Sequence, residues 1–229
     1  MGIREIKFKD NRKKEIVFLS SCILNQNNRF PGIAVDRGAI NDLIEPLLKD
    51  GIGIEQLPCL ECIGWGGVSR NSIFRFLPSI FRHPNSKLMK LSSKIWLSKY
   101  QRLCKKEAKR IVKRIENYIL NGYRIVSIVG MNDSPTCGVT KTMNLLKSIF
   151  HYRESKIELK DFESPNIEKM KNLIPRMLIE GQGIFMKELI SKIRKKRFDI
   201  LIIGFDPWLD IEKEANRIRD LIFKHELKI

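Results

Sequence analysis

Three cysteines occupy positions at which thiol chemistry is to be expected. Cys22 ends the predicted strand 15–22, Cys59 directly follows the predicted strand 53–58, and Cys137 lies in the turn 134–138, of sequence SPTCG, shortly after the apolar run 125–130. Thiolates are the natural ligands of iron–sulfur clusters and of zinc. Because the carboxyl ends of parallel strands meet at one edge of a sheet, these three cysteines can converge on one site. The alternative is that each is a buried, inert cysteine.

The two remaining cysteines are interpreted differently. Cys62 forms a CxxC pair with Cys59, which favours a redox-active pair, half of a zinc site or an additional metal ligand. Cys104 lies on an apolar helical stripe and is expected to pack in the core. The wide separation of the first three cysteines argues against a zinc ribbon or a ferredoxin module. Three protein ligands would leave one metal position open for substrate or water.

The elements that must position these cysteines alternate between strand and helix patterns. Continuous apolar runs predict buried parallel strands, and apolar residues three or four positions apart predict helices. The predicted strands cover 15–22, 53–58, 125–130 and 198–205, and the predicted helices cover 39–49, 98–120, 187–194 and 211–225. We expect a loop at 61–67 and irregular structure at 151–180. The pattern predicts one α/β domain over 1–229, a Rossmann-like parallel sheet flanked by helices.

A basic segment interrupts this alternation. Between residues 69 and 114 the chain carries fourteen Lys or Arg residues and one acid, Glu107. Residues 69–97 also contain aromatic residues and two prolines, and we interpret them as a partly helical insertion. The excess charge predicts an anionic partner, either tRNA bound through 69–114 or an anionic lipid surface. A solvated basic face with no partner is the alternative.

Composition agrees with a globular protein. The 229 residues have a net charge of +17, and 43% of them are hydrophobic. No apolar run reaches the roughly 20 residues that span a bilayer, and residues 1–14 lack the apolar core of a signal peptide. We therefore expect a cytoplasmic protein without a transmembrane segment, in which the five cysteines are thiols or metal ligands.

Four motifs, in order along nearly the whole chain, resemble the TudS-related desulfidases, relatives of the bacterial thiouracil desulfidase. They are SSCILNQN at 20–27, QLPCLE at 56–61, SPTCGV at 134–139 and GIFMKEL at 183–189. The resemblance implies an enzyme whose [4Fe–4S] cluster is held by Cys22, Cys59 and Cys137. The fourth iron is then free to take the sulfur of a thiocarbonyl in a thiolated nucleobase, nucleoside or related compound. Leu60 and Thr136 depart from residues common in that family, and Cys62 is an additional thiol.

Such a desulfidation needs a group that deprotonates water and donors that hold the substrate. Ser134, Glu55 and Glu61 are the candidates for acid–base work, while Glu55 could instead be a solvent-facing strand residue and Glu61 a helix cap. Asn25 and Arg29 are the candidates for substrate binding, or they order the first loop.

Two functions of other classes compete with this reading. One is a basic nucleic-acid-binding module whose cysteines only pack or bind structural metal. The other is a zinc-dependent hydrolase that uses the same three thiolates.

Overall fold

A parallel sheet lies at the centre of the computed structural model, which describes residues 10–75, 86–143 and 167–226. Its four strands are in the order β2-β1-β3-β6. Their bounds are Glu15–Ser20 for β1, Gly53–Leu57 for β2, Arg124–Met131 for β3 and Leu201–Phe205 for β6. Helices cover both faces of the sheet, which is why the central strands are apolar along nearly their whole length.

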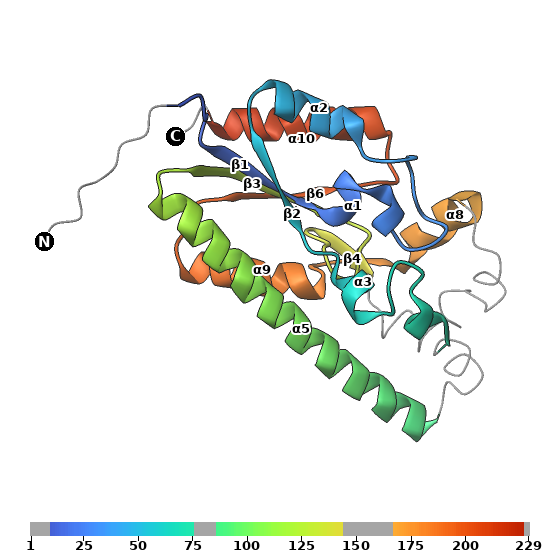
Figure 1. Ribbon diagram of the computed structural model, residues 1–229. Helices are drawn as coiled ribbons and strands as arrows, with labels where there is room; N and C mark the ends of the chain where they lie inside the picture. The colour runs from blue at the N-terminus through green and yellow to red at the C-terminus, as the bar shows by residue number, and fades with distance from the viewer. Residues whose placement is uncertain (1–9, 76–85, 144–166, 227–229) are drawn as a thin grey trace, which may run out of the picture.

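The helices form two outer layers (Figure 1). Helix α2 (Asn41–Lys49) packs beside α10 (Ile211–Glu226) on one face, and α5 (Lys87–Leu120) packs beside α9 (Ile184–Lys195) on the other. Each presents an apolar face to the sheet, and the core between the layers is fully buried at residues such as Leu43, Ile115 and Ile218. The predicted Rossmann-like α/β class is confirmed.

The strand order creates a topological switch point between β1 and β3. The chain leaves β1 for β2 on one side, and then passes to the other side of β1 to form β3. In open parallel sheets, ligands bind in the crevice beyond the carboxyl ends of the strands at such a point. The segments that follow β1, β2 and β3 are therefore the first place to look for a site. The first two begin with the short helices α1 (Ser21–Leu24) and α3 (Leu60–Gly64).

Helix α5 begins eleven residues before the start expected from the sequence, and so includes part of the predicted insertion. Its first turn is capped by Ser86, whose hydroxyl accepts a hydrogen bond from the backbone N–H of Met89 at 3.3 Å. Trp96 stacks on Tyr100 at a centroid distance of 5.7 Å, and Trp65 packs against both rings. This aromatic packing stabilises a helical segment whose own apolar periodicity is weak. Residues 76–85 of the insertion lie outside the described ranges.

Two segments expected to be irregular contain helices. α3 occupies the first part of the predicted loop 61–67, and α8 (Ile167–Met177) lies within 151–180. Pro175 suggested that this segment was irregular, but it sits in the last turn of α8. There the chain leaves the helix for β5 (Leu178–Glu180), which pairs with β4 (Lys141–Met143). The helix or turn expected up to residue 150 lies partly outside the described residues.

Across the described ranges, every helix is too short or too polar to cross a membrane.

Truncating the α9 side of the core should destabilise the protein strongly. Leu189 is fully buried, so Leu189→Ala removes buried apolar atoms and leaves a cavity, and we expect a loss of about 2–5 kcal/mol in the free energy of unfolding. Leu209 is 59% exposed, so Leu209→Ala should change it by less than about 0.5 kcal/mol. Urea unfolding monitored by circular dichroism measures both; equal effects would contradict the placement of α9.

Candidate functional site

A cavity of about 120 Å³ lies at the carboxyl edge of the sheet, and three cysteines line it. They come from the segments that follow three different strands: Cys22 is in α1, Cys59 is the residue before α3, and Cys137 lies beyond β3. The strand order that produces the switch point therefore brings these residues to one cavity. Among the other predicted site residues, Arg29, Glu61 and Ser134 also line it.

The hydroxyl of Ser134 organises the turn that carries Cys137. Its Oγ accepts hydrogen bonds from the backbone N–H groups of Thr136 and Cys137, both at 3.0 Å, as a capping serine does. The same hydroxyl donates to Oε1 of Glu61 at 2.7 Å. Ser134 thus has three partners, and it fixes the turn and the carboxylate together.

The N-terminus of α9 holds the other side of the turn. The N–H groups of Gly183 and Ile184 donate to the carbonyls of Gly138 and Pro135, each at 2.9 Å. A Cβ at Gly138 would lie 2.2 Å from the carbonyl oxygen of Lys141, and one at Gly183 would lie 2.4 Å from the carbonyl carbon of Thr136. Only glycine permits backbone segments to approach this closely. This contact gives a structural reason why the chain carries the motifs 134–139 and 183–189 together.

Helix α5 supports the turn through a buried hydroxyl pair. Tyr100 OH lies 2.6 Å from Thr136 Oγ1, and the Tyr100 ring packs between Trp96 and Trp65. Thr136 departs from the residue common in the family that the motifs resemble, and its hydroxyl has a defined partner here. The position of Cys137 therefore depends on α5 and α9 as well as on β3.

Glu61 is a buried carboxylate at the edge of the cavity. Burial raises its pKa above the ordinary value, while the hydrogen bond from Ser134 and the nearby charge of Arg70 act in the opposite direction. The Nη2 atom of Arg70 is 3.9 Å from Oε2 of Glu61. A carboxylate with a raised pKa is better able to accept a proton from water near neutral pH than an exposed one.

Burial also raises the pKa of the three thiols that line the cavity. It raises the pKa of Cys22 to about 12, and it raises the pKa of Cys59 and Cys137 as well. Without a cation these side chains are therefore neutral thiols at pH 7. Binding of a metal requires their deprotonation and would release protons.

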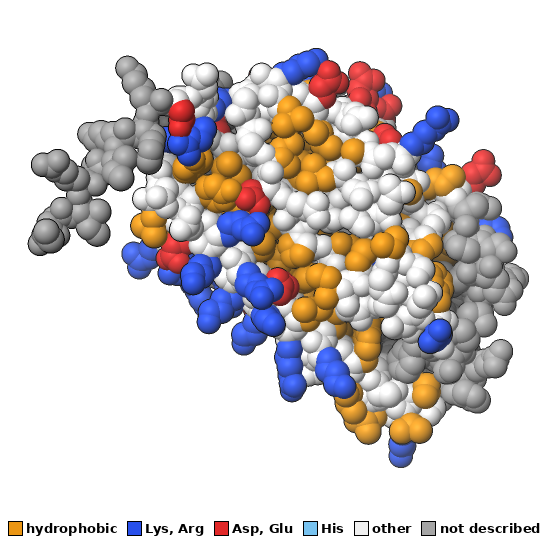
Figure 2. Space-filling view, in the orientation of Figure 1, with side chains coloured by type: hydrophobic (Ala, Val, Ile, Leu, Met, Phe, Trp, Pro, Cys, Tyr) orange, Lys and Arg blue, Asp and Glu red, His pale blue; other side chains and the backbone are white. Residues whose placement is uncertain are grey.

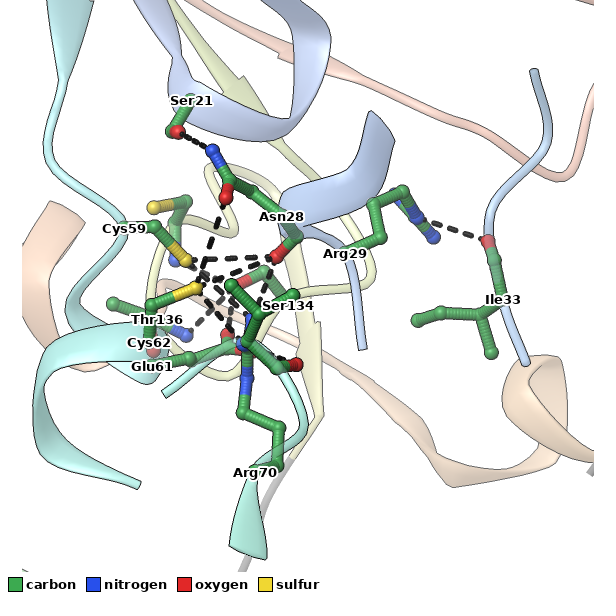
Figure 3. A network of polar contacts seen from close by, with 12 residues as sticks. Ser21, Asn28, Arg29, Ile33, Cys59, Glu61, Cys62, Arg70, Ser134 and Thr136 are labelled. Carbon is green, nitrogen blue, oxygen red and sulfur yellow. Dashed lines mark hydrogen bonds and ion pairs between the residues drawn. The ribbon is translucent and has the colours of Figure 1, made fainter. Parts of the chain in front are cut away.

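Arg70 is completely buried beside two of the cysteines (Figure 3). Its Nη1 donates to Sγ of Cys62 at 2.8 Å, and its Nη2 lies 3.5 Å from Sγ of Cys59 and 2.6 Å from the carbonyl oxygen of Asn28. Both thiols also contact that carbonyl. Cys62 is thus held by Arg70 next to Cys59, but it is not among the described residues that line the cavity.

A second buried ion pair closes the cavity on the side of the first loop. Nη2 of Arg29 is 2.6 Å from Oδ2 of Asp133, and each side chain is only 2% exposed. Nε of Arg29 donates to the carbonyl of Ile33 at 2.9 Å, which ties the loop after α1 to the pair. Arg29 therefore orders this loop and lines the cavity at the same time.

Two predicted site residues lie elsewhere. Glu55 is on β2, where it accepts hydrogen bonds from Tyr118 at 2.6 Å and Arg114 at 2.8 Å, both on α5. The side chain of Asn25 accepts from the backbone N–H of Asn27 at 3.0 Å and caps a single 3₁₀ turn, Gln26–Asn28. Neither is among the described residues that line the cavity. Asn25 thus orders the first loop, which the sequence left open as the alternative, whereas Glu55 is partly buried against α5 and not solvent-facing.

Sequence reasoning missed several residues that line the cavity or support it. Asp133 directly precedes the SPTCG turn, and that position could have drawn attention to it. Arg70 was counted only as one of many cations, although the two glycines before it indicated a tight turn. The apolar end of the cavity gave no signal, because its residues come from distant segments. They are Phe30, Ile33, Met143, Met170, Ile174 and Met177.

The donor set of the cavity suits a sulfur-containing cluster. Within the described ranges, no group of three His, Cys, Asp or Glu side chains is arranged to hold a metal ion. A cuboidal cluster is larger than one ion and is ligated by cysteines at separate corners. Nε1 of Trp65, which lines the cavity, and Nε of Arg70 are buried donors without a hydrogen-bond partner in the described structure. Hydrogen-bond donors beside cluster sulfurs are a usual feature of such sites.

The fold and the site define an α/β protein with three cysteines gathered at the switch point of a parallel sheet. The chain is 30% identical over 167 residues to the uncharacterized protein MJ0003 of Methanocaldococcus jannaschii, and the alignment covers 72% of this chain and 95% of the archaeal one. It therefore belongs to the same family as that protein. No family model and no solved structure matches the chain.

Removing one partner of the buried Arg29–Asp133 pair should be costly. Asp133→Ala leaves the guanidinium buried without a counter-charge, so we expect a loss of about 3–5 kcal/mol in the free energy of unfolding. Glu45 forms an exposed pair with Lys49, and Glu45→Ala should leave the free energy of unfolding close to that of the wild type. Chemical denaturation compares the two variants. The double variant Arg29→Met/Asp133→Leu should recover part of the loss; equal stability of Asp133→Ala and the wild type would contradict the buried pair.

Proposed function

We propose that this protein is a desulfidase that removes sulfur from the thiocarbonyl group of a small thiolated compound, such as a thiolated nucleobase or nucleoside. The observation that carries the proposal is the convergence of Cys22, Cys59 and Cys137 on one cavity that also contains the hydrogen-bonded pair Ser134–Glu61. Three thiols from the segments that follow three separate strands, with a buried carboxylate beside them, form a site with both soft metal ligands and an acid–base group.

Cys22, Cys59 and Cys137 are the residues that would hold a [4Fe–4S] cluster. When bound through three cysteines, such a cluster supplies one iron without a protein ligand, a Lewis acid suited to a soft sulfur atom. The chain's own contribution is to fix the positions of the thiols. It does so through α1, the N-terminus of α3 and the turn held by α9, and it places the Arg70 guanidinium beside Cys59.

Glu61 is the proposed acceptor of the proton from the attacking water. Its Oε1 is fixed by Ser134, and its burial raises its pKa, so the carboxylate can take a proton at Oε1 or Oε2 and later return it. Ser134 acts as a positioning residue, because its Oγ is engaged by two backbone N–H groups and by Glu61. Arg29 and Asp133 close the cavity on the side of the first loop.

The other end of the cavity favours an uncharged part of the substrate. Met143, Met170 and Met177 give it flexible, polarizable walls that adapt to a flat ring. The thiol ligands require a reducing compartment, and the proposal places the protein in the cytoplasm.

Metal analysis of anaerobically purified protein tests the cofactor. The wild type should be brown and contain about four irons and four sulfides per chain. Cys22→Ser, Cys59→Ser and Cys137→Ser should each lose most of this iron, because each removes one corner ligand. Cys104→Ala is the matched control: Cys104 is buried in α5 and is not among the described residues that line the cavity, so its replacement should leave the iron content unchanged. A wild type that binds one zinc and no iron would point instead to a hydrolase.

Turnover by Glu61 variants tests the acid–base assignment. Glu61→Gln should lower kcat for release of hydrosulfide from 2-thiouracil by about 10²–10⁴-fold, a usual contribution of general acid–base catalysis, without loss of iron. Glu55→Gln removes a carboxylate that is held by α5 outside the cavity, and its kcat should equal that of the wild type. The reverse pattern would refute the assignment to Glu61.

A further inference from the structure

The solvent-facing side of helix α5 begins with an apolar stripe. Leu88, Leu91 and Ile95 are 69%, 56% and 50% exposed, and their spacing places them on one face of the helix. Three lysines alternate with them in sequence, namely Lys87, Lys90 and Lys94, and all three are exposed. Figure 1 shows that this end of α5 extends well beyond the sheet. The stripe is therefore an exposed aliphatic edge bordered by cations.

The same side of α5 continues as a basic stripe towards the C-terminus of the helix. Arg102, Lys106, Lys109 and Lys113 follow one another at intervals of three or four residues, and all are exposed. With 3.6 residues per turn, these cations and the three apolar residues share one face, opposite the buried Cys104 and Ile115. The combined stripe from Leu88 to Lys113 is about 37 Å long at 1.5 Å per residue.

Most of the cations of α5 have no counter-charge. The helix carries eleven Lys and Arg residues, of which Arg110 pairs with Glu107 and Arg114 with Glu55. The other nine form no ion pair with the described residues of the chain. Figure 2 shows these positive side chains in a row along the lower edge of the molecule, with hydrophobic side chains gathered at its lower tip. The surface thus lacks an acidic partner within the described chain.

The positive charge and the exposed apolar residues on the outer face of α5 together indicate which kind of partner fits it. A second copy of this chain would bring the same unpaired cations against this face, so self-association is electrostatically unfavourable. A nucleic acid would neutralise the cations but leave Leu88, Leu91 and Ile95 in water, since no aromatic residue among them offers a stacking surface. An anionic lipid surface satisfies both parts, because aliphatic side chains enter the acyl boundary while lysines contact the headgroups.

We propose that the outer face of α5 binds the surface of an anionic bilayer. Leu88, Leu91 and Ile95 insert at the boundary of headgroups and acyl chains, and Arg102, Lys106, Lys109 and Lys113 lie along the headgroups. The long stems of the lysines remain beside the apolar stripe while their ammonium groups stay in water. The opposite side of α5 stays packed on the sheet and on α9, so the fold need not change on binding.

Co-sedimentation of the full chain with lipid vesicles tests the proposal. The protein should bind vesicles of phosphatidylcholine mixed with phosphatidylglycerol, should not bind phosphatidylcholine alone, and should be released by high salt. Lys106→Gln/Lys109→Gln should weaken binding about thirtyfold, since each lysine near an anionic surface contributes about 1 kcal/mol. Leu88→Gln/Leu91→Gln should weaken it by about tenfold or more, because it removes the inserted aliphatic groups.

Two matched variants control for charge and exposed apolar area in general. Lys213→Gln/Lys224→Gln removes two exposed cations of α10, and Leu48→Gln/Leu209→Gln removes two leucines that are 56% and 59% exposed. Both should bind vesicles as the wild type does. Equal loss in the α5 variants and in these controls would overturn the proposal. The proposal would also be overturned if the protein did not bind vesicles but retained tRNA on filters, and if the leucine substitutions left that retention unchanged. That result would assign the face to nucleic acid.

Discussion

The main-chain hydrogen bonds between the turn 134–138 and the first turn of α9 are the constraint on which the site depends. A helix N-terminus has N–H groups without partners inside the helix, and here carbonyls of the cysteine turn satisfy them. The close backbone contact needs glycine at 183, and glycine at 138 lets the turn pass close to the carbonyl of Lys141. Ser134 then adds the last restraint, since its hydroxyl binds the turn from within and Glu61 from across the cavity. The position of Cys137 is consequently determined by segments far apart in the sequence.

Buried charge is the second organising feature of this edge of the sheet. Arg29 with Asp133, and Arg70 with Glu61, place two guanidinium groups and two carboxylates out of contact with bulk water. Such arrangements are costly, because desolvation can exceed the attraction between the partners. Arg70 also has a backbone φ of 55°, which a residue with a side chain rarely adopts. Strain and buried charge of this kind persist where the surrounding structure determines them, and they concentrate at functional sites.

The sequence was sufficient for the parts of the fold that follow from local pattern. The residue pattern located all four strands of the described sheet. The alternation with helices predicted that the strands are parallel and that the cysteines lie at their carboxyl ends. It was insufficient where tertiary contacts decide. The early start of α5 depends on stacking between Trp65, Trp96 and Tyr100, and the choice between Glu55 and Glu61 depends on which side of β2 faces α5. The sequence did not single out Arg70, because composition does not distinguish a buried arginine from an exposed one.

The origin of the three thiols in three different strand-to-helix connections has a consequence for how the protein matures. In small modules with closely spaced cysteines, a short peptide can capture metal before the rest of the chain has folded. No short segment here carries more than one of the three cavity thiols, and Cys137 is oriented by a helix that follows it in the chain. The three thiols therefore form one site only after β1, β2, β3 and α9 have come together. A newly synthesised molecule would then be folded before any cofactor is bound, with Cys137 buried and Cys22 and Cys59 only partly buried.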